Sequence, residues 1–168
     1  DAVDAARCAT IVGGHNLGER YLLGEYDTFL DEPEYVDSQA ALHMLDSDHA
    51  GSVSELLALR GASYTVGGAC ASGGIALRSA VDELRHRDHE VAVVVGAMLD
   101  YSGLGLQAMA LLGAISIESF NDAPARASRP YDRRREGFVP CHGAGALVLE
   151  TLAHARRRGA RIYAEVLD

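Results

Sequence analysis

Short apolar runs, separated by amphipathic stretches, dominate the hydrophobic pattern of this chain. The run at 8–12 ends in two glycines, and the run at 90–97 is almost continuous in Val and Ala. Runs of this length and β-branched content are typical of strands buried on both faces, as in a largely parallel sheet. A further strand is predicted at 143–150. Residues 161–167 alternate apolar and polar side chains, which predicts a last strand.

In most of the remaining chain, apolar residues recur every three or four positions, which is typical of amphipathic helices. The helical segments are expected at 16–31, at 38–60 with an interruption near 46–48, at 103–114 as a helix or loop packed in the core, and at 151–158, ending at Gly159. In the second of these, Ser47 or Asp48 is the expected N-cap after the interruption, and Gly61 is the expected C-terminal residue.

The chain is organised around residues 64–74. There a β-branched run gives way to small residues, and a helical pattern then extends to about His86. Together with the strand at 90–97 this forms a strand–helix–strand unit, which predicts an α/β layered architecture. Cys70 lies at the junction between the first strand of this unit and its helix.

Cys70 is the candidate for chemistry. The first N–H groups of a helix lack intrahelical partners, and the helix dipole places about half a positive charge there, which stabilises a negative sulfur. The spacing leaves two interpretations open: a nucleophile, or a buried structural cysteine. His15 directly follows the first strand. A side chain there can line a site, but a surface or capping role is the expected one.

Composition limits the classes of function. The chain has 168 residues, enough for one domain with its own core, and its formal net charge of −9 argues against a general nucleic-acid binder. No apolar run approaches the roughly 20 residues needed to span a bilayer. Three cysteines, Cys8, Cys70 and Cys141, are too few and too scattered for a disulfide framework or a CxxC metal site. A reducing cytoplasm is the expected location.

Several segments, in this order and spacing, resemble the β-ketoacyl synthase (condensing enzyme) family. They are the Cys70 turn, AVVVGA at 92–97, SRPYDRRREGF at 128–138, GAGALVLE at 143–150 and HARRRGARIYAEV at 154–166. The resemblance implies a thiolase-like, layered α-β-α fold built from two similar halves. Residues 1–168 are then expected to be a partial N-terminal domain that lacks its first strand and helix and the whole C-terminal half. An apolar face should remain exposed where that half packs.

The resemblance also implies a reaction. In this family the cysteine at the matching turn accepts an acyl chain as a thioester, and a carrier-bound malonyl extender then loses CO2 and attacks that thioester. Cys70 matches this nucleophile, and its backbone N–H would be one donor of the oxyanion hole. The two catalytic His motifs of the family belong to the C-terminal half, and none of the seven His of this sequence matches them. Turnover is therefore expected only together with that half.

Partners follow from the same resemblance. No bound cofactor is implied, because substrates are carried on the phosphopantetheine of an acyl carrier protein, and a homodimer is expected through the strand at 63–68. Carrier proteins are acidic, so Arg156 to Arg158 and Arg161 are candidate docking residues. The Arg cluster at 126–135 has two interpretations, a docking surface for the acidic carrier protein or a structural ion network at the sheet edge. The second, made of Arg129, Asp132 and Arg133, is the expected one.

Three segments, at 12–16, 46–51 and 139–143, resemble a subgroup attached to polyketide β-branching. His142 lies in the last of them, where many condensing enzymes have an acidic residue or Gly. Members of that subgroup are ketosynthase-like decarboxylases that turn malonyl-carrier protein into acetyl-carrier protein, and they commonly carry Ser in place of the nucleophile. Because Cys70 is retained, condensation is favoured and decarboxylation is the alternative. A non-catalytic ketosynthase partner subunit is the third hypothesis, although such partners usually lack the cysteine.

Overall fold

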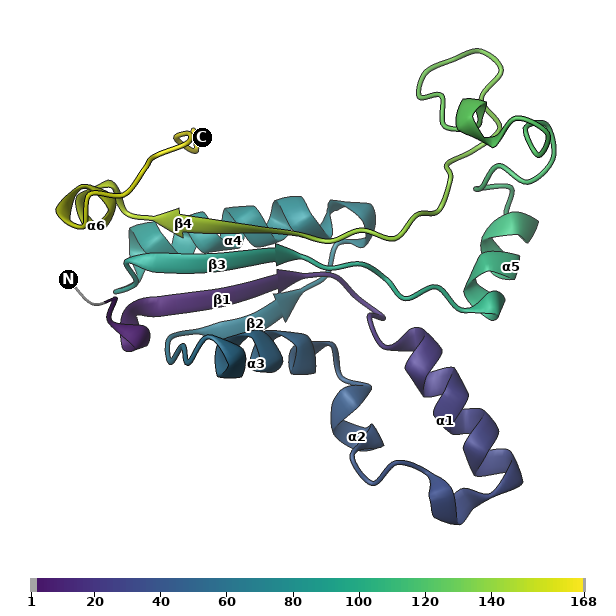
Figure 1. Ribbon diagram of the computed structural model, residues 1–168, viewed down its shortest axis with the longest axis horizontal. Coiled ribbons are helices and arrows are strands. Elements are labelled where there is room, and N and C mark those ends of the chain that lie inside the picture. Colours follow the sequence, from purple (N-terminus) through teal and green to yellow (C-terminus); the bar gives the residue numbers. More distant parts are fainter. Residues whose placement is uncertain (1–2, 168) are drawn as a thin grey trace.

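The computed structural model describes residues 3–167 as one sheet flanked by helices (Figure 1). The strands are β1 (Cys8–Gly13), β2 (Ser63–Val66), β3 (Val91–Gly96) and β4 (Gly145–Glu150). The helices are α1 (Glu19–Asp31), α2 (Ala40–His43), α3 (Asp46–Leu56), α4 (Ser72–His86), α5 (Gly103–Leu111) and α6 (Leu152–Arg157). Short 3-10 turns lie at Ala5–Arg7, Pro33–Tyr35, Ala69–Ala71 and Pro124–Arg126.

The strands are arranged in the order β2-β1-β3-β4. β1 lies parallel to both of its neighbours, with Ile11 opposite Tyr64 of β2 and Val94 of β3. β4 lies antiparallel to β3, and Gly96 pairs with Gly145 where β4 begins. Helix α4 connects β2 to β3 across β1, which is the crossover that parallel strands require. The predicted α/β class and the largely parallel sheet are confirmed.

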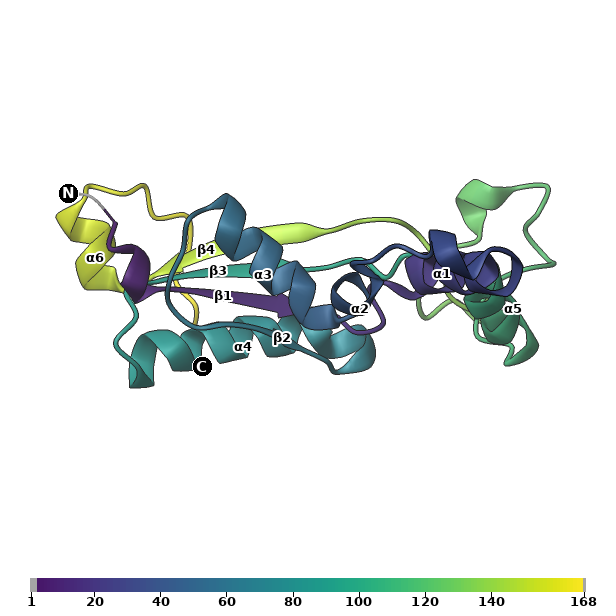
Figure 2. The same cartoon turned by 90° about the horizontal axis from the view of Figure 1, so that it is seen from below.

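Helices cover both faces of the sheet (Figure 2). On one face, Ala76 and Ala80 of α4 are fully buried against Ile11 of β1 and Val94 of β3. Alanines at these positions bring the helix close to the strands, because they carry no side chain beyond Cβ. On the other face, Val12 of β1 packs with residues of α3 and of the loop after β1. Neighbouring residues of β1 thus pack against helices on opposite faces of the sheet, because successive side chains of a strand point to opposite faces.

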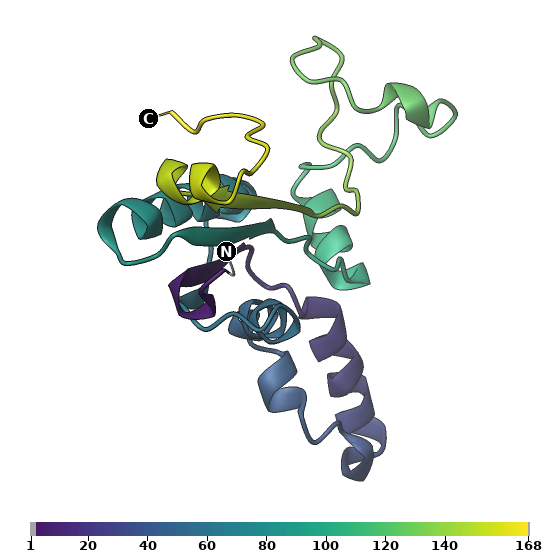
Figure 3. The ribbon, with the colours of Figure 1, turned by 60° about the vertical axis from the view of Figure 1, so that its left-hand side comes forward.

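Two parts of the chain project beyond the sheet (Figures 1 and 3). One holds α1 and α2, and the other holds α5 and the long segment before β4. Leu104, Leu111 and Leu112 of this second part are 66%, 80% and 80% exposed, so the expected packing of 103–114 in the core is wrong. Leu147 and Val148 of β4 are also exposed. These side chains form exposed apolar surface, and its cover by a C-terminal half stays a prediction.

Helix α3 begins and ends differently from the prediction. Leu45 is its N-cap residue, and Ser47 and Asp48 lie inside its first turn, so neither is the cap. The helix stops at Leu56, well before Gly61, because Ala58 adopts a left-handed conformation with φ 53°. The N–H groups that follow donate back to helix carbonyls, Ala58 to Glu55 and Leu59 to Ser54. This is a Schellman ending with Ala where glycine is usual.

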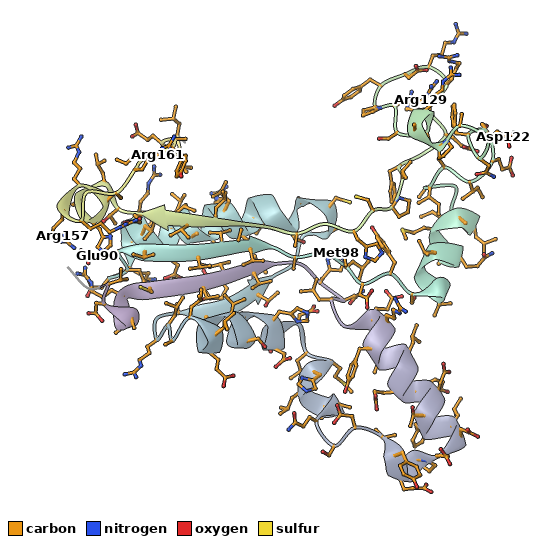
Figure 4. The ribbon with its side chains drawn as sticks, in the orientation of Figure 1. Glu90, Met98, Asp122, Arg129, Arg157 and Arg161 are labelled. Carbon is orange, nitrogen blue, oxygen red and sulfur yellow. The ribbon has the colours of Figure 1, made fainter. Side chains whose placement is uncertain are left out.

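The predicted strand at 161–167 does not form. Gly159, with φ 67°, turns the chain after α6, and residues 160–167 run without strand pairing. Alternation of apolar and polar residues produces a strand only where a sheet edge accepts it. The Arg161 guanidinium instead lies 4.8 Å from the ring centroid of Tyr163 (Figure 4). Between residues 3 and 167, no helix combines the length and the apolar content needed to cross a bilayer.

Candidate functional site

Cys70 lies in the 3-10 turn between the end of β2 and the first residue of α4. Its side chain is exposed among the described residues, which argues against a buried structural cysteine, and its role as a nucleophile stays a prediction. The residue before it, Ala69, has φ 49°, a left-handed conformation that costs an L-residue about 1–2 kcal/mol. Strain of this kind is concentrated where a fold presents a functional group. The sequence therefore locates the exposed thiol correctly at the strand–turn–helix junction.

Ser72 fixes the turn that carries Cys70. Its side chain is buried, and its hydroxyl accepts a hydrogen bond from the Gly68 N–H at 2.9 Å and donates one to the Ala69 carbonyl at 2.7 Å. The Ala71 N–H closes the turn by donating to the Gly68 carbonyl at 3.0 Å. The sequence analysis missed this residue. The available signal was a hydroxyl side chain at the start of a predicted helix, where such groups bond locally to the backbone.

The carboxyl ends of the three parallel strands converge on this turn. The N–H of Gly14, after β1, donates to the carbonyl of Val66 at 3.0 Å. A Cβ atom on Gly13 would lie 2.4 Å from the Ser72 carbonyl oxygen, so β1 and the start of α4 are in backbone contact. A Cβ atom on Gly73 would similarly lie 3.9 Å from the Gly96 Cα at the end of β3. Parallel α/β sheets bind their ligands at this edge.

The segment before β4 reaches the same edge from the other side. The Gly143 N–H donates to the sulfur of Met98 at 3.1 Å, and the ring of His142 meets the ring of Tyr101 edge to face at 6.1 Å. Met98 follows the end of β3 in Figure 4. Cys141 is exposed as well. The topology therefore collects Cys70, His15, Met98 and His142 at one edge of the sheet, although they are far apart in sequence.

Cys8 is the structural cysteine of the chain. It is 1% exposed at the start of β1, and its thiol donates to the Asp4 carbonyl at 3.1 Å. Burial, followed by the nearby charges of Asp4 and Glu90, raises the pKa of this thiol. Cys8 is therefore held in its neutral form, which is the reverse of what a nucleophile requires.

Two further polar contacts involve α1, α2 and the start of α3. Between α1 and α2, the Tyr21 hydroxyl donates to Asp37 at 2.7 Å, and this hydrogen bond raises the pKa of Tyr21 to about 12. Nδ1 of His43 lies 3.1 Å from a carboxylate oxygen of Asp48. Among residues 3–167, no three His, Cys, Asp or Glu side chains are grouped so that they could hold a metal ion. The first contact joins α1 to the segment before α2, and the second joins α2 to α3.

The charged clusters only partly match the prediction. Asp132 pairs with Arg129 at 3.6 Å and with Arg134 at 3.5 Å, whereas Arg133 makes no ion pair with any described residue. This network lies on the projecting segment, around the labelled Arg129 in Figure 4, so its predicted place at the sheet edge is wrong. The Arg129 guanidinium also lies 4.4 Å from the ring centroid of Phe120.

The basic residues of α6 and its C-cap are largely engaged within the chain. Arg157 pairs with Glu90 at 2.9 Å (Figure 4), and Arg158 pairs with Glu150. The carboxylate of Glu90 also lies 3.1 Å from Arg7. Side chains that already balance carboxylates are less available to an acidic partner, so carrier docking at this helix stays a prediction.

The fold and this edge define the class of protein: an α/β domain with an exposed thiol at the start of the helix that crosses its sheet. The sequence model described as "Beta-ketoacyl synthase, N-terminal domain" matches residues 1–155. The chain belongs to the β-ketoacyl synthase family.

Relatives of known name agree with this assignment. The chain is 34% identical over 164 residues, 98% of its length, to the polyketide biosynthesis malonyl-ACP decarboxylase PksF of Bacillus subtilis. It is 44% identical over 118 residues, 70% of its length, to 3-oxoacyl-(acyl-carrier-protein) synthase 2 of Rhizobium meliloti. These alignments cover 40% and 28% of the two relatives, so the chain spans less than half of the length of either protein.

Solved structures show the same fold. A β-ketoacyl synthase from Burkholderia phymatum superposes with a TM-score of 0.80 at 28% identity, covering 96% of this chain and 39% of that protein. The ketosynthase of a type II polyketide synthase, solved with its acyl-carrier protein, superposes with a TM-score of 0.81 at 24% identity over 96% of this chain and 41% of that one. The thiolase-like fold expected from the sequence is thereby confirmed.

Proposed function

We propose that the chain is the nucleophile-bearing part of a β-ketoacyl–carrier-protein synthase of polyketide or fatty-acid biosynthesis. The observation that carries this proposal is the exposed thiol of Cys70 on a strained turn, braced by Ser72, at the start of α4. A nucleophile needs an accessible sulfur and a fixed direction of approach, and the turn provides both. The named relatives include both a carrier-protein-dependent synthase and a malonyl-ACP decarboxylase.

The proposed first step is acyl transfer to sulfur. The Cys70 thiolate attacks the carbonyl carbon of an acyl group on the phosphopantetheine of a carrier protein. The Cys70 backbone N–H donates to the oxyanion. The carbon–sulfur bond to the carrier then breaks, and the departing thiolate takes up the proton that Cys70 released. In the second step a carrier-bound malonyl group loses CO2, its carbanion attacks the Cys70 thioester, and Cys70 leaves as the thiolate. This second step is proposed to need the C-terminal half of the family fold.

Mass spectrometry of the intact gene product tests the first step. Incubation with an acyl–carrier protein should add one acyl group to Cys70. The Cys70→Ala variant should take up none, and Cys141→Ala, which removes the other exposed thiol of this edge, should load like the wild type. Loading that survives Cys70→Ala would refute the assignment. Resistance of Cys70 to iodoacetamide would favour a non-catalytic partner subunit.

Decarboxylation is the second candidate. It is favoured by the likeness to a malonyl-ACP decarboxylase over 98% of the chain. The two activities separate when the intact protein receives malonyl-carrier protein together with an acyl donor. A β-ketoacyl product supports the synthase, whereas acetyl-carrier protein as the sole product would establish the decarboxylase.

A homodimer through the strand at 63–68 is also proposed. β2 lies at the end of the strand order and pairs only with β1 among the described strands, so one of its edges is open. An open edge can pair with the same strand of a second copy about a two-fold axis. Sedimentation velocity of the intact protein at micromolar concentration should show a dimer, and a monomer would contradict this proposal.

A further inference from the structure

The two loops that leave β1 and β2 separate to opposite faces of the sheet. The chain after β1 leads to α3, which packs against β1 and β2 on one face, and the chain after β2 enters α4 on the other face (Figure 2). Adjacent parallel strands whose connections diverge in this way open a crevice at their carboxyl ends, and α/β proteins bind ligands there. Cys70 lies in one of the two loops. His15 lies in the other.

The loop that carries His15 is held firmly by its backbone. The Ala97 N–H donates to the Gly13 carbonyl at 3.0 Å, and the Gly14 N–H donates to Val66. The N–H groups of Asn16 and Leu17 both donate to the carboxylate of Asp46, at 3.0 and 2.9 Å. Asn16 accepts a left-handed conformation, φ 52°, within this arrangement. The backbone on both sides of His15 is therefore fixed.

The side chain of His15, in contrast, is uncommitted. It is exposed, and its imidazole makes no hydrogen bond to any residue between 3 and 167. Its position is nevertheless defined by the turn that bears the thiol, because a Cβ atom on Gly67 would lie 3.4 Å from the His15 Cβ. Gly67 stands three residues before Cys70. A neutral imidazole offers one N–H donor and one nitrogen acceptor, so a polar group with open hydrogen-bonding capacity lies next to the start of the turn that carries Cys70.

We propose that His15 is a specificity-determining residue: it hydrogen-bonds the acyl group carried on Cys70 and favours oxygenated acyl groups over plain alkyl groups of the same size. The inference rests on the proposed acyl transfer at Cys70. An alkyl group that displaces water from the imidazole leaves its polar atoms unpaired, whereas a hydroxyl or keto oxygen replaces the lost hydrogen bond. The fixed backbone on both sides of His15 limits the positions that its imidazole can reach, and the acyl group would supply the missing hydrogen-bond partner.

A competition between two isosteric acyl groups tests this role. The intact protein receives the N-acetylcysteamine thioesters of 3-hydroxybutyrate and 3-methylbutyrate together, and mass spectrometry measures the initial rate of Cys70 acylation by each. The wild type should prefer the hydroxylated group. His15→Leu and His15→Ala should each lower the ratio of the two rates, His15→Leu by about tenfold, the order of effect of leaving one polar group unpaired. His15→Gln keeps a donor and an acceptor and should retain most of the preference.

The matched control is His86→Leu, which removes an exposed histidine at the far end of α4. It should leave the ratio unchanged. A ratio within twofold of wild type in both His15→Leu and His15→Ala, with both variants folded by circular dichroism, overturns the role of His15 while acyl transfer stands. If the wild type accepts neither thioester, the same two acyl groups are presented on a carrier protein. Absence of loading from that donor as well would end the proposed function at its first step, and the role of His15 falls with it. Two variants are used so that the ratio of acylation rates can still be compared with wild type if one variant fails to fold.

Discussion

The hydroxyl of Ser72 donates to the carbonyl of Ala69 across 2.7 Å and accepts from Gly68, so one buried side chain closes the turn that presents Cys70. Ser72→Ala removes both hydrogen bonds, and we expect a loss of about 1–2 kcal/mol of unfolding free energy, measured by urea denaturation. The Gly68 amide loses its acceptor, so its hydrogen exchange should accelerate by about tenfold or more. Ser47→Ala, at an exposed position of α3, is the control and should change neither quantity. An unchanged hydrogen-exchange rate at Gly68 in Ser72→Ala would show that the Ser72 hydroxyl does not hold the turn closed.

The backbone contact between β1 and α4 predicts unequal effects at two glycines. A Cβ atom on Gly13 would lie 2.4 Å from the Ser72 carbonyl oxygen, whereas one on Gly24 of α1 meets no atom within 4 Å. Gly13→Ala must push backbone apart and should cost about 3 kcal/mol or more. Gly24→Ala should gain about 0.5–1 kcal/mol, because alanine restricts the unfolded chain and suits a helix interior. Urea denaturation of both variants checks the pair, and equal effects would argue against the contact.

The ending of α3 offers a stabilising substitution. Ala58 occupies the left-handed position of a Schellman ending, with φ 53°. Glycine is free of the Cβ clash in this conformation, so Ala58→Gly should raise the unfolding free energy by about 0.5–1 kcal/mol. Ala153→Gly, at an exposed position inside α6, should instead lower it by about 1 kcal/mol. A loss of stability in Ala58→Gly would show that its conformation is not strained in solution.

Buried strands and the helix after Cys70 were predictable from sequence. A continuous run of Val and Ala such as 90–97 is typical of a strand that is buried on both faces. The small residues around Cys70 mark the turn directly. The strand at 161–167 failed because alternation describes a strand only when a neighbour pairs with it. Likewise the apolar character of α5 predicted burial, although the described chain places nothing over Leu111 and Leu112.

The candidate site was only half visible in the sequence. Cys70 could be picked out from its local sequence, because small residues surround it at a predicted strand–helix junction. The contact between the loop of His15 and the turn at Gly67 depends on β1 and β2 becoming neighbours, and no local pattern encodes that pairing. The same holds for His142, which reaches this edge because β4 runs antiparallel to β3. Residues that are distant in sequence and meet only through the strand order can be assigned to one site only from the structure.

Glu150, at the end of β4, provides a pH-dependent prediction. Its carboxylate accepts hydrogen bonds from the Arg158 guanidinium and lies 2.7 Å from Nδ1 of His154. The hydrogen bond from Arg158, followed by that from His154, lowers the pKa of Glu150 from 4.5 to about 2. Because the folded-state pKa lies below the unfolded value, the stabilisation is complete above about pH 4.5 and is lost as the pH falls towards 2.

Glu150→Gln should therefore lower the unfolding free energy by about 2 kcal/mol at pH 7, since it leaves Arg158 and the buried His154 without their carboxylate. The difference from wild type should shrink steadily below pH 4.5 and nearly vanish near pH 2, where Glu150 of the wild type becomes protonated too. Urea denaturation at a series of pH values measures it. Glu55→Gln, at an exposed position of α3, should show little difference at any pH. A Glu150→Gln penalty that is equally large at pH 7 and pH 2 would mean that packing, rather than the charge of the carboxylate, holds α6 to the end of β4.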